Sequence, residues 1–233
     1  MEKLIQACIF DLDGVLTETA HLHYSSWKRL AAEWGFDLSP ELNKQLKGVS
    51  RKASLDLILK WSDKTATDEE KAEMMERKNQ WYLEEVDKLT PNDCLPYAID
   101  FLDELDRNNI PYALGSGSKN AKTILEKIGL TQRFKWRLDG NDVQIGKPNP
   151  ELFIKAAEAM NSDRSKTVVF EDAEAGISAA LKGGFLAVSF GTDEEPKRIS
   201  HFHLNSWEGV SLETIEMGLN DLSCKDTEWN GVD

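Results

Sequence analysis

Short apolar runs alternate with longer amphipathic stretches along most of the chain. Four runs have the length and composition of buried strands, and they cover residues 3–10, 112–114, 167–170 and 185–190. Segments with helical periodicity lie between these runs, and they cover 97–108, a stretch ending at Gly129, 150–160 and 173–182. Strands that alternate with helices of this length are typical of a parallel sheet with crossover helices. We therefore predict an α/β fold, with a Rossmann-like parallel sheet core flanked by helices.

The region from residue 19 to residue 88 departs from this alternation and has almost wholly helical periodicity. One helix that ends at Gly35 has an apolar face, made of Trp27, Leu30, Ala31 and Trp34. Ser39-Pro40 has the pattern of an N-cap and a first helical residue, and Thr67 with Glu70 that of a capping box opening a helix through Lys88. We predict an α-helical cap domain at 19–91, inserted after the first strand into a core of residues 1–18 and 92–233.

Composition and charge narrow the functional classes. No apolar run approaches the roughly 20 residues that span a bilayer, and Asp11 interrupts the first run too early for a secretory signal. Three widely spaced cysteines argue against a disulfide framework, so we expect a cytoplasmic protein. The formal net charge of −13 disfavours nucleic acid and acidic membranes as partners. A phosphorylated substrate would require a metal and local basic residues to reverse the sign inside its site.

Polar motifs follow the predicted strands at the edge where open α/β sheets bind ligands. They are the pair Asp11 and Asp13 before Gly14, the turn Gly115–Ser118, Lys147 before a helix, and the pair Glu171-Asp172. Each motif alone has a structural explanation: an acidic turn, a Gly/Ser turn, a surface lysine and the charges of a helix start. All four in order, at strand ends, favour phosphoryl transfer. A divalent cation would relieve the repulsion between the carboxylates, while one attacks phosphorus and the other moves a proton.

The same motifs carry a resemblance to known proteins. The chain resembles the haloacid dehalogenase superfamily of phosphotransferases, and within it most closely the β-phosphoglucomutase family. The resemblance extends over about residues 4–191, and the stretches that support it are FDLDGVLTETAHLHYSSW, QLKGVSRKASL, SGSKN, GKPNPELF and FEDAEAGI. Beyond Gly191 the resemblance is poor.

The resemblance implies a role for each motif in the core. Asp11 would be the nucleophile and Asp13 the general acid/base. Mg²⁺ would be held by the Asp11 carboxylate, the Asp13 backbone carbonyl and Asp172, with Glu171 in or next to that shell. The transferring phosphoryl group would be bound by Ser116, the Gly117 amide and Lys147.

The resemblance also implies roles for the cap. Arg51 would clamp a second phosphate together with core residues Ser118, Lys119 and Asn120, and its segment includes Lys47 and Gly48. Thr19, His23 and Lys78 would couple lid closure to the position of Asp13. We expect Trp27 to pack in the core of the insert, and we also include it in the predicted substrate-binding set. Without the resemblance, Lys47 and Arg51 have an alternative interpretation as helix-end cations, and His23 as a packing or surface histidine.

The expected activity is interconversion of β-D-glucose 1-phosphate and glucose 6-phosphate through the 1,6-bisphosphate, in a monomer that needs Mg²⁺. One alternative is a phosphatase of the same superfamily, acting on sugar phosphates or other small phosphomonoesters. A second alternative is a non-catalytic phosphate-binding regulatory protein. The presence of Asp11, Asp13, Ser116, Lys147 and Asp172 argues against the second.

Overall fold

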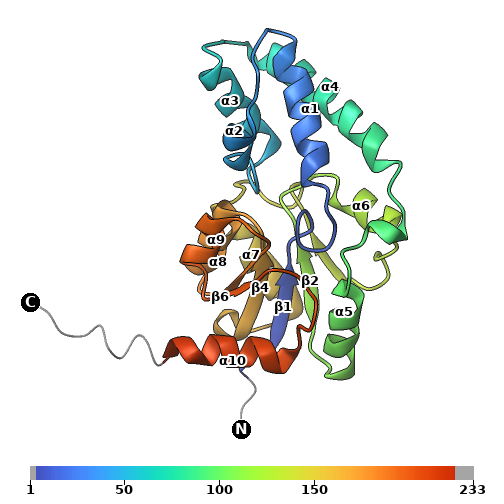
Figure 1. The fold of residues 1–233 in the computed structure, drawn as a ribbon, viewed down its shortest axis with the longest axis vertical. Coiled ribbons are helices and arrows are strands. Elements are labelled where there is room, and N and C mark those ends of the chain that lie inside the picture. Colours follow the sequence, from blue (N-terminus) through green and yellow to red (C-terminus); the bar gives the residue numbers. More distant parts are fainter. Residues whose placement is uncertain (1–3, 224–233) are drawn as a thin grey trace, which may run out of the picture.

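A computed structural model describes residues 4–223, and its centre is an all-parallel sheet of six strands in the order β3-β2-β1-β4-β5-β6 (Figure 1). The strands are β1 (Ala7–Phe10), β2 (Tyr112–Gly115), β3 (Trp136–Leu138), β4 (Thr167–Glu171), β5 (Leu186–Phe190) and β6 (Phe202–Leu204). The predicted α/β class and parallel sheet are confirmed. β1 lies between β2 and β4, so the first strand of the chain is at the middle of the sheet.

Alternate residues of β1 face the two sides of the sheet, as the period of a strand requires. Ala7 and Ile9 pack in a cluster with α7 (Glu151–Met160) and α8 (Glu174–Lys182), next to which lies α9 (Glu194–Ile199). Cys8 and Phe10 pack in a second cluster on the other side. The helices of that side are α5 (Ala98–Arg107), α6 (Ala121–Lys127) and α10 (Leu212–Ser223). Short 3₁₀ helices, η1 (Pro91–Asp93) and η2 (Arg164–Lys166), complete the core. Both faces of β1 are therefore buried.

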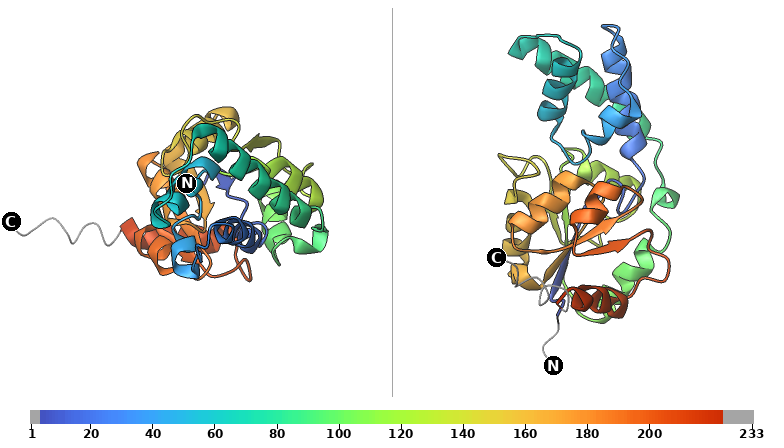
Figure 2. Two further views of the ribbon diagram at one scale, coloured as in Figure 1. Left: turned by 90° about the horizontal axis from the view of Figure 1, so that it is seen from above. Right: turned by 60° about the vertical axis from the view of Figure 1, so that its left-hand side comes forward.

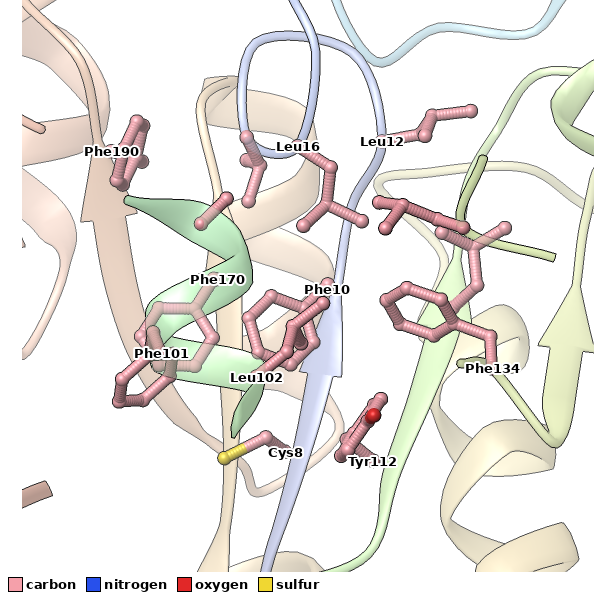
Figure 3. Close-up of a cluster of buried hydrophobic side chains, with 14 of the residues drawn as sticks. Cys8, Phe10, Leu12, Leu16, Phe101, Leu102, Tyr112, Phe134, Phe170 and Phe190 are labelled. Atoms are coloured by element: carbon pink, nitrogen blue, oxygen red, sulfur yellow. The ribbon is translucent and has the colours of Figure 1, made fainter. Parts of the chain in front are cut away.

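An aromatic cluster fixes the loop after β1 (Figure 3). The Phe10 ring stacks on Phe170 with ring centroids 4.9 Å apart. The Trp207 ring lies 5.1 Å from each of the Phe101 and Phe170 rings, and its indole N–H donates to the Val15 carbonyl oxygen at 2.7 Å. Trp207 lies beyond the region of sequence resemblance, yet its hydrogen bond holds the loop that carries the predicted catalytic aspartates.

The helices of the insert form a separate body above the carboxyl ends of the strands (Figures 1 and 2). They are α1 (Ala20–Ala32), α2 (Pro40–Lys44), α3 (Arg51–Trp61) and α4 (Asp68–Val86). Their own hydrophobic cluster includes Trp27, Leu30, Leu55 and Ile58. Below, these four helices, their N-cap residues and the loops that join them are called the cap, and the remainder of the described chain is called the core. The domain boundaries at residues 18/19 and 91/92 stay a prediction.

The predicted helix starts in the cap are confirmed. The Ser39 side chain accepts a hydrogen bond from the Leu42 N–H. Both hydrogen bonds of the capping box are present, because the Glu70 N–H donates to Thr67 Oγ1 and the Thr67 N–H donates to Glu70 Oε2. These contacts satisfy N–H groups that a helix leaves free in its first turn. They define where two cap helices begin.

Two expectations at the ends of the chain differ from the structure. β1 begins at Ala7, later than the apolar run that begins at residue 3. The sequence predicts a loosely held tail beyond Leu219, but α10 continues to Ser223. This prediction was wrong for residues 220–223 because their polar composition obscured the continuation of the helix; the rest of the tail lies outside the described residues.

Within residues 4–223 no helix combines the length and the hydrophobicity that crossing a membrane would require. Cys8 and Cys94 are both free thiols, as the spacing of the cysteines predicts. Cys224 lies outside the described residues.

Candidate active site

The topology brings the predicted motifs together at one edge of the sheet. Asp11 follows β1, Ser116 follows β2, and Glu171 ends β4 with Asp172 directly after it. These three strands are neighbours, and their carboxyl ends point to the same side. The Asp11 N–H still donates to the Phe170 carbonyl oxygen at 3.0 Å, so the backbone stays paired up to the predicted nucleophile.

Two glycines allow the chain to pass close to the acidic side chains. Gly14 has φ of +80°, and a Cβ there would lie 2.5 Å from Asp172 Oδ2. Gly176 of α8 faces Glu171, and a Cβ there would lie 2.0 Å from the Glu171 carboxyl carbon. A larger residue at either position would collide with a carboxylate, so both glycines are needed for the close packing of this site.

Lys147 is buried and bridges the predicted nucleophile and the second acidic motif. Its ammonium donates to Asp11 Oδ1 at 2.6 Å, to Glu171 Oε2 at 2.6 Å and to the Gly115 carbonyl oxygen at 3.2 Å. Burial opposes the charged form, but the two carboxylates outweigh it and raise the pKa of Lys147. The side chain is therefore a fixed positive charge beside Asp11.

Asp11, Glu171 and Asp172 form a compact group of buried carboxylates. One oxygen of each lies within 4.8 Å of the others. Burial, with the charge of Asp11 as a further cause, raises the pKa of Glu171 to about 8 and that of Asp172 to about 7. Burial and the neighbouring carboxylate thus disfavour the ionised forms, and a bound divalent cation would favour them. Carboxylate oxygens are hard ligands that suit Mg²⁺, so the group fits the predicted metal.

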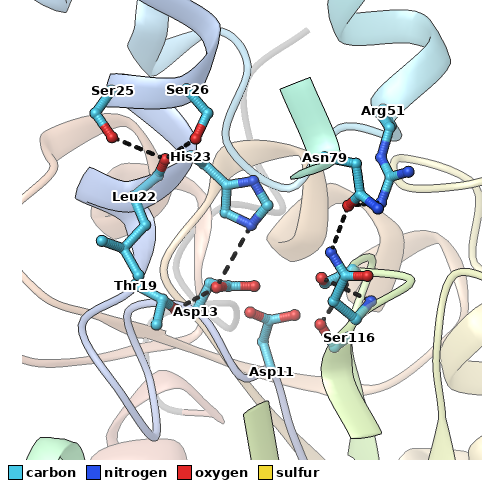
Figure 4. A network of polar contacts seen from close by, with 12 residues as sticks. Asp11, Asp13, Thr19, Leu22, His23, Ser25, Ser26, Arg51, Asn79 and Ser116 are labelled. Atoms are coloured by element: carbon cyan, nitrogen blue, oxygen red, sulfur yellow. Dashed lines mark hydrogen bonds and ion pairs between the residues drawn. The ribbon is translucent and has the colours of Figure 1, made fainter. Parts of the chain in front are cut away.

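Asp13 points toward the cap rather than toward this group (Figure 4). Its carboxylate accepts a hydrogen bond from the Thr19 hydroxyl, and His23 Nε2 lies 3.7 Å from Asp13 Oδ1. Burial and then the charge of Asp11 raise the pKa of Asp13 to about 6. An acid with a pKa near neutrality can both give and take a proton. The Asp13 carboxylate is not part of the group of three carboxylates, and the use of its backbone carbonyl as a metal ligand stays a prediction.

His23 connects Asp13 to a buried lysine of the cap. His23 Nδ1 lies 3.0 Å from Lys78 Nζ, and the imidazole stacks on Tyr82 with centroids 4.1 Å apart. Burial and the Lys78 charge hold the pKa of His23 well below its ordinary value, so the ring is neutral. Burial lowers the pKa of Lys78 to about 7, with Arg51 as a second cause. This arrangement connects the cap to Asp13 through side chains that titrate near neutrality or below.

Trp27 belongs to the hydrophobic cluster of the cap and also borders the cavity. It is buried in the hydrophobic cluster of the cap, and its ring also lies 4.9 Å from Lys78 Nζ at the wall of the central cavity. The expectation that Trp27 packs in the core of the insert is therefore confirmed, and the residue also borders the cavity.

Arg51, the cap residue of the predicted phosphate clamp, and Lys47 of the same segment have different partners. Lys47 donates to Asp172 Oδ2 at 3.3 Å and to Asp193 Oδ2 at 2.7 Å. Arg51 Nη2 donates to Asn79 Oδ1 at 2.7 Å. Lys47 therefore lies beside the candidate metal ligands, whereas Arg51 belongs to a separate polar group.

Sequence reasoning missed Asn79 and Asp193. Asp193 follows β5 at the carboxyl edge of the sheet, and the rule that located the other motifs would have found it. Asn79 follows Lys78 in the middle of α4, where no local pattern distinguishes it from other polar helix residues.

The Gly115–Ser118 turn folds back on its own side chains. The Ser118 N–H donates to Ser116 Oγ at 3.1 Å, and the Asn120 N–H donates to Ser118 Oγ at 3.2 Å. The N–H groups of Ser118 and Asn120 are therefore already bound by serine hydroxyls. The turn is preorganised, and it presents Gly117 and Ser118 to the cavity.

A cavity of about 540 Å³ between the cap and the core collects the predicted site residues. Those that line it are Asp11, Asp13, His23, Trp27, Lys47, Gly48, Arg51, Lys78, Gly117, Ser118, Lys119, Lys147 and Asp172. The four others, Thr19, Ser116, Asn120 and Glu171, each hydrogen-bond to a residue of that set. The structure therefore brings all the predicted site residues into one place.

Known proteins share this sequence and fold. The haloacid dehalogenase-like hydrolase family matches residues 5–184. A β-phosphoglucomutase of Bacillus subtilis is 39% identical over 189 residues, which are 80% of this chain and 84% of that protein. A phosphorylated carbohydrates phosphatase of Thermotoga maritima is 28% identical over 181 residues, 77% of this chain and 82% of that protein.

Solved structures agree with the sequence comparisons. The crystal structure of a β-phosphoglucomutase from Clostridium difficile superimposes with a TM-score of 0.89 at 36% identity, over 94% of this chain and 99% of that one. The family match covers most of the chain, and the Bacillus relative is similar over most of its own length. The chain therefore belongs to the haloacid dehalogenase-like hydrolase family.

Proposed function

We propose that this protein interconverts β-D-glucose 1-phosphate and glucose 6-phosphate through the 1,6-bisphosphate, with Asp11 as the phosphate carrier. Relatives named as β-phosphoglucomutases, 39% and 36% identical to this chain, support this substrate. The observation that carries the proposal is the position of Lys147 and Arg51 at the wall of one cavity between the cap and the core. Lys147 donates a hydrogen bond to Asp11 in the core, and Arg51 of the cap lines the same cavity. A substrate with two phosphates matches this arrangement.

In the first half-reaction, a carboxylate oxygen of Asp11 attacks the phosphorus of one phosphate of the bisphosphate. The bond between phosphorus and the sugar oxygen breaks, and the Asp13 carboxyl gives its proton to that oxygen. Lys147 stabilises the charge on the transferring group. The raised pKa of Asp13, about 6, makes the acid form accessible at neutral pH.

In the second half-reaction, the monophosphate presents its other hydroxyl. The Asp13 carboxylate takes the proton of that hydroxyl. At the same time the hydroxyl oxygen attacks the phosphorus of the aspartyl-phosphate, and the bond between phosphorus and Asp11 breaks. Thr19 and His23, at the start of the cap, hold Asp13 in place for both steps. Asp11 and Asp172 would hold Mg²⁺ together with the Asp13 carbonyl, with Glu171 in or next to that shell, and the ion would supply positive charge for the transferring phosphoryl group.

A sugar-phosphate phosphatase is the second candidate. The Thermotoga relative is named as a phosphatase of phosphorylated carbohydrates, so the same core serves hydrolysis in a relative of this chain. The two functions differ only in what attacks the aspartyl-phosphate, a sugar hydroxyl or water.

A coupled assay separates the two candidates. We expect glucose 6-phosphate to form from β-glucose 1-phosphate, and far more slowly from the α anomer, with Mg²⁺ and bisphosphate primer present. Inorganic phosphate is measured in the same reaction. If nearly all turnover appears as inorganic phosphate, the mutase proposal fails and the phosphatase remains.

A further inference from the structure

Asn79 joins the cap to the core through a single amide oxygen. Asn79 Oδ1 accepts from Arg51 Nη2 at 2.7 Å and from Asn120 Nδ2 at 2.9 Å (Figure 4). Asn79 belongs to α4, Arg51 is the first residue of α3, and Asn120 precedes α6 of the core. One neutral acceptor therefore binds two donors, one from the cap and one from the core.

The Arg51 guanidinium has a neutral partner, the Asn79 amide oxygen. A carboxylate at this distance would form an ion pair and cancel the guanidinium charge, whereas an amide oxygen orients the group and leaves its charge available. Arg51 lines the cavity and is partly buried, which strengthens its field there. The Glu76 carboxylate lines the same cavity and offsets part of the Arg51 charge, but no ion pair joins the two side chains within the described residues. A guanidinium has five N–H donors, so holding one at Asn79 leaves others for an anion.

We propose that Asn79 is a positioning residue of a second phosphate subsite. It orients Arg51 and Asn120 toward the phosphate that is remote from Asp11, and its neutrality preserves the positive charge that binds this phosphate. The proposal rests on the proposed function in one respect, since it requires a substrate or intermediate with two phosphates.

A merely structural role for Asn79 leads to a different expectation. If the residue only ties the cap to the core, an aspartate should serve at least as well. Asp has nearly the same shape as Asn, and its hydrogen bonds to Arg51 and Asn120 would be as strong or stronger. If the residue preserves charge for a phosphate, the same aspartate should be harmful. Asn79→Asp therefore separates the two roles by the sign of its effect.

The test measures binding of glucose 1,6-bisphosphate by calorimetry, in an Asp11→Asn background that prevents turnover. We expect Asn79→Asp to weaken binding by about tenfold or more, the scale of one lost charge-assisted hydrogen bond, and Asn79→Ala to weaken it less. Gln80→Glu is the matched control, because Gln80 is the next residue of α4, is exposed, and undergoes the same change of charge. We expect it to change binding by less than about twofold.

Two results would overturn the proposal. One is unchanged or tighter bisphosphate binding in Asn79→Asp. The other is an equal loss in Gln80→Glu, which would mean a general field effect. Thermal unfolding of Asn79→Asp should show no loss of stability, so that weaker binding cannot be attributed to a damaged fold.

A second measurement separates this proposal from the proposed mutase activity. With Asp11 intact, hydrolysis of a small aryl phosphate involves no remote phosphate. Asn79→Asp should therefore lose less in kcat/KM for that substrate than in bisphosphate affinity, whether the enzyme is a mutase or a phosphatase. Equal losses would mean that Asn79 acts on the whole site rather than on one subsite.

Discussion

At the scale of single residues, two aspartates one residue apart have environments suited to different tasks. Asp11 is bound by the Lys147 ammonium and lies in the carboxylate group that fits a metal. Asp13 is turned away from that group, is bound by Thr19 and has a pKa raised to about 6. Different environments for paired carboxylates are the usual means of dividing nucleophilic and acid/base roles. The geometry supports Asp11 as the nucleophile and Asp13 as the acid/base.

Asp13→Asn tests that division. An amide keeps the size of the side chain and can still accept from Thr19, but it cannot transfer a proton. We expect the mutase rate to fall by about 10² to 10⁴-fold, the usual contribution of a general acid/base. Phosphorylation of Asp11 by an aryl phosphate with a good leaving group should fall less in single-turnover measurements, because that leaving group needs no proton.

Asp11→Asn is the companion variant, and we expect it to abolish both reactions while the far-ultraviolet circular dichroism stays that of the wild type. Similar losses in the two reactions for Asp13→Asn would contradict its role as a proton donor.

At the scale of elements, α4 connects the far end of the cap to the cavity. Its first turn carries the Thr67–Glu70 capping box, and its later turns carry Lys78, Asn79 and Tyr82. With a rise of about 1.5 Å per residue, the capping box lies roughly 16 Å from Lys78 along the helix. The box should therefore stabilise the cap without taking part in binding.

Thr67→Ala tests this separation. Loss of a side-chain N-cap should lower the free energy of unfolding by about 1 kcal/mol, as measured by urea denaturation. Thr67→Ser is the matched control, because a serine hydroxyl can accept the same hydrogen bond from the Glu70 N–H. We expect turnover at saturating substrate to change by less than about twofold in both variants. A tenfold loss of turnover with unchanged stability would show that the cap end communicates with the site.

At the scale of the whole molecule, the negative charge of the protein opposes the binding of a negatively charged phosphate substrate. The chain has a formal net charge of −13, and three carboxylates meet at the centre of its site. The folded protein holds the protons of Glu171 and Asp172 more tightly than the unfolded chain, since their pKa values are raised to about 8 and about 7. In the absence of metal this pair stabilises the fold most below the ordinary carboxyl pKa. That contribution is lost as the pH rises through about 7 and 8.

Metal binding should become stronger as the pH rises, because the cation must displace the protons held by Glu171 and Asp172. We expect the affinity for Mg²⁺, measured by calorimetry, to increase by about tenfold or more between about pH 6 and about pH 8.5. The protein should release protons on binding, which a change of buffer with a different ionisation enthalpy reveals. Asp172→Asn should bind Mg²⁺ more weakly and with a smaller dependence on pH. An affinity that does not depend on pH would contradict the assignment of these carboxylates as the metal site.

The sequence by itself determined the fold class and the catalytic edge, because both follow from local patterns. The apolar runs predict strands, and connectivity through helices makes the sheet parallel. Asp11, Ser116 and the pair Glu171-Asp172 follow predicted strands directly, so they had to meet at the carboxyl edge. The strand before Lys147 is β3, which the apolar pattern did not predict. Even the helix starts at Ser39 and Thr67 were predictable, since a cap acts within one turn.

Only the tertiary structure decided which side chains meet across the cavity. Lys47 and Asp193 are 146 residues apart, and Asn79 and Asn120 are 41 apart. These pairs join helices or loops that no local pattern relates, and their geometry depends on how the cap packs over the sheet. The pKa values near neutrality at Asp13, Lys78 and Asp172 have the same origin, since burial is a property of the assembled fold and not of any segment.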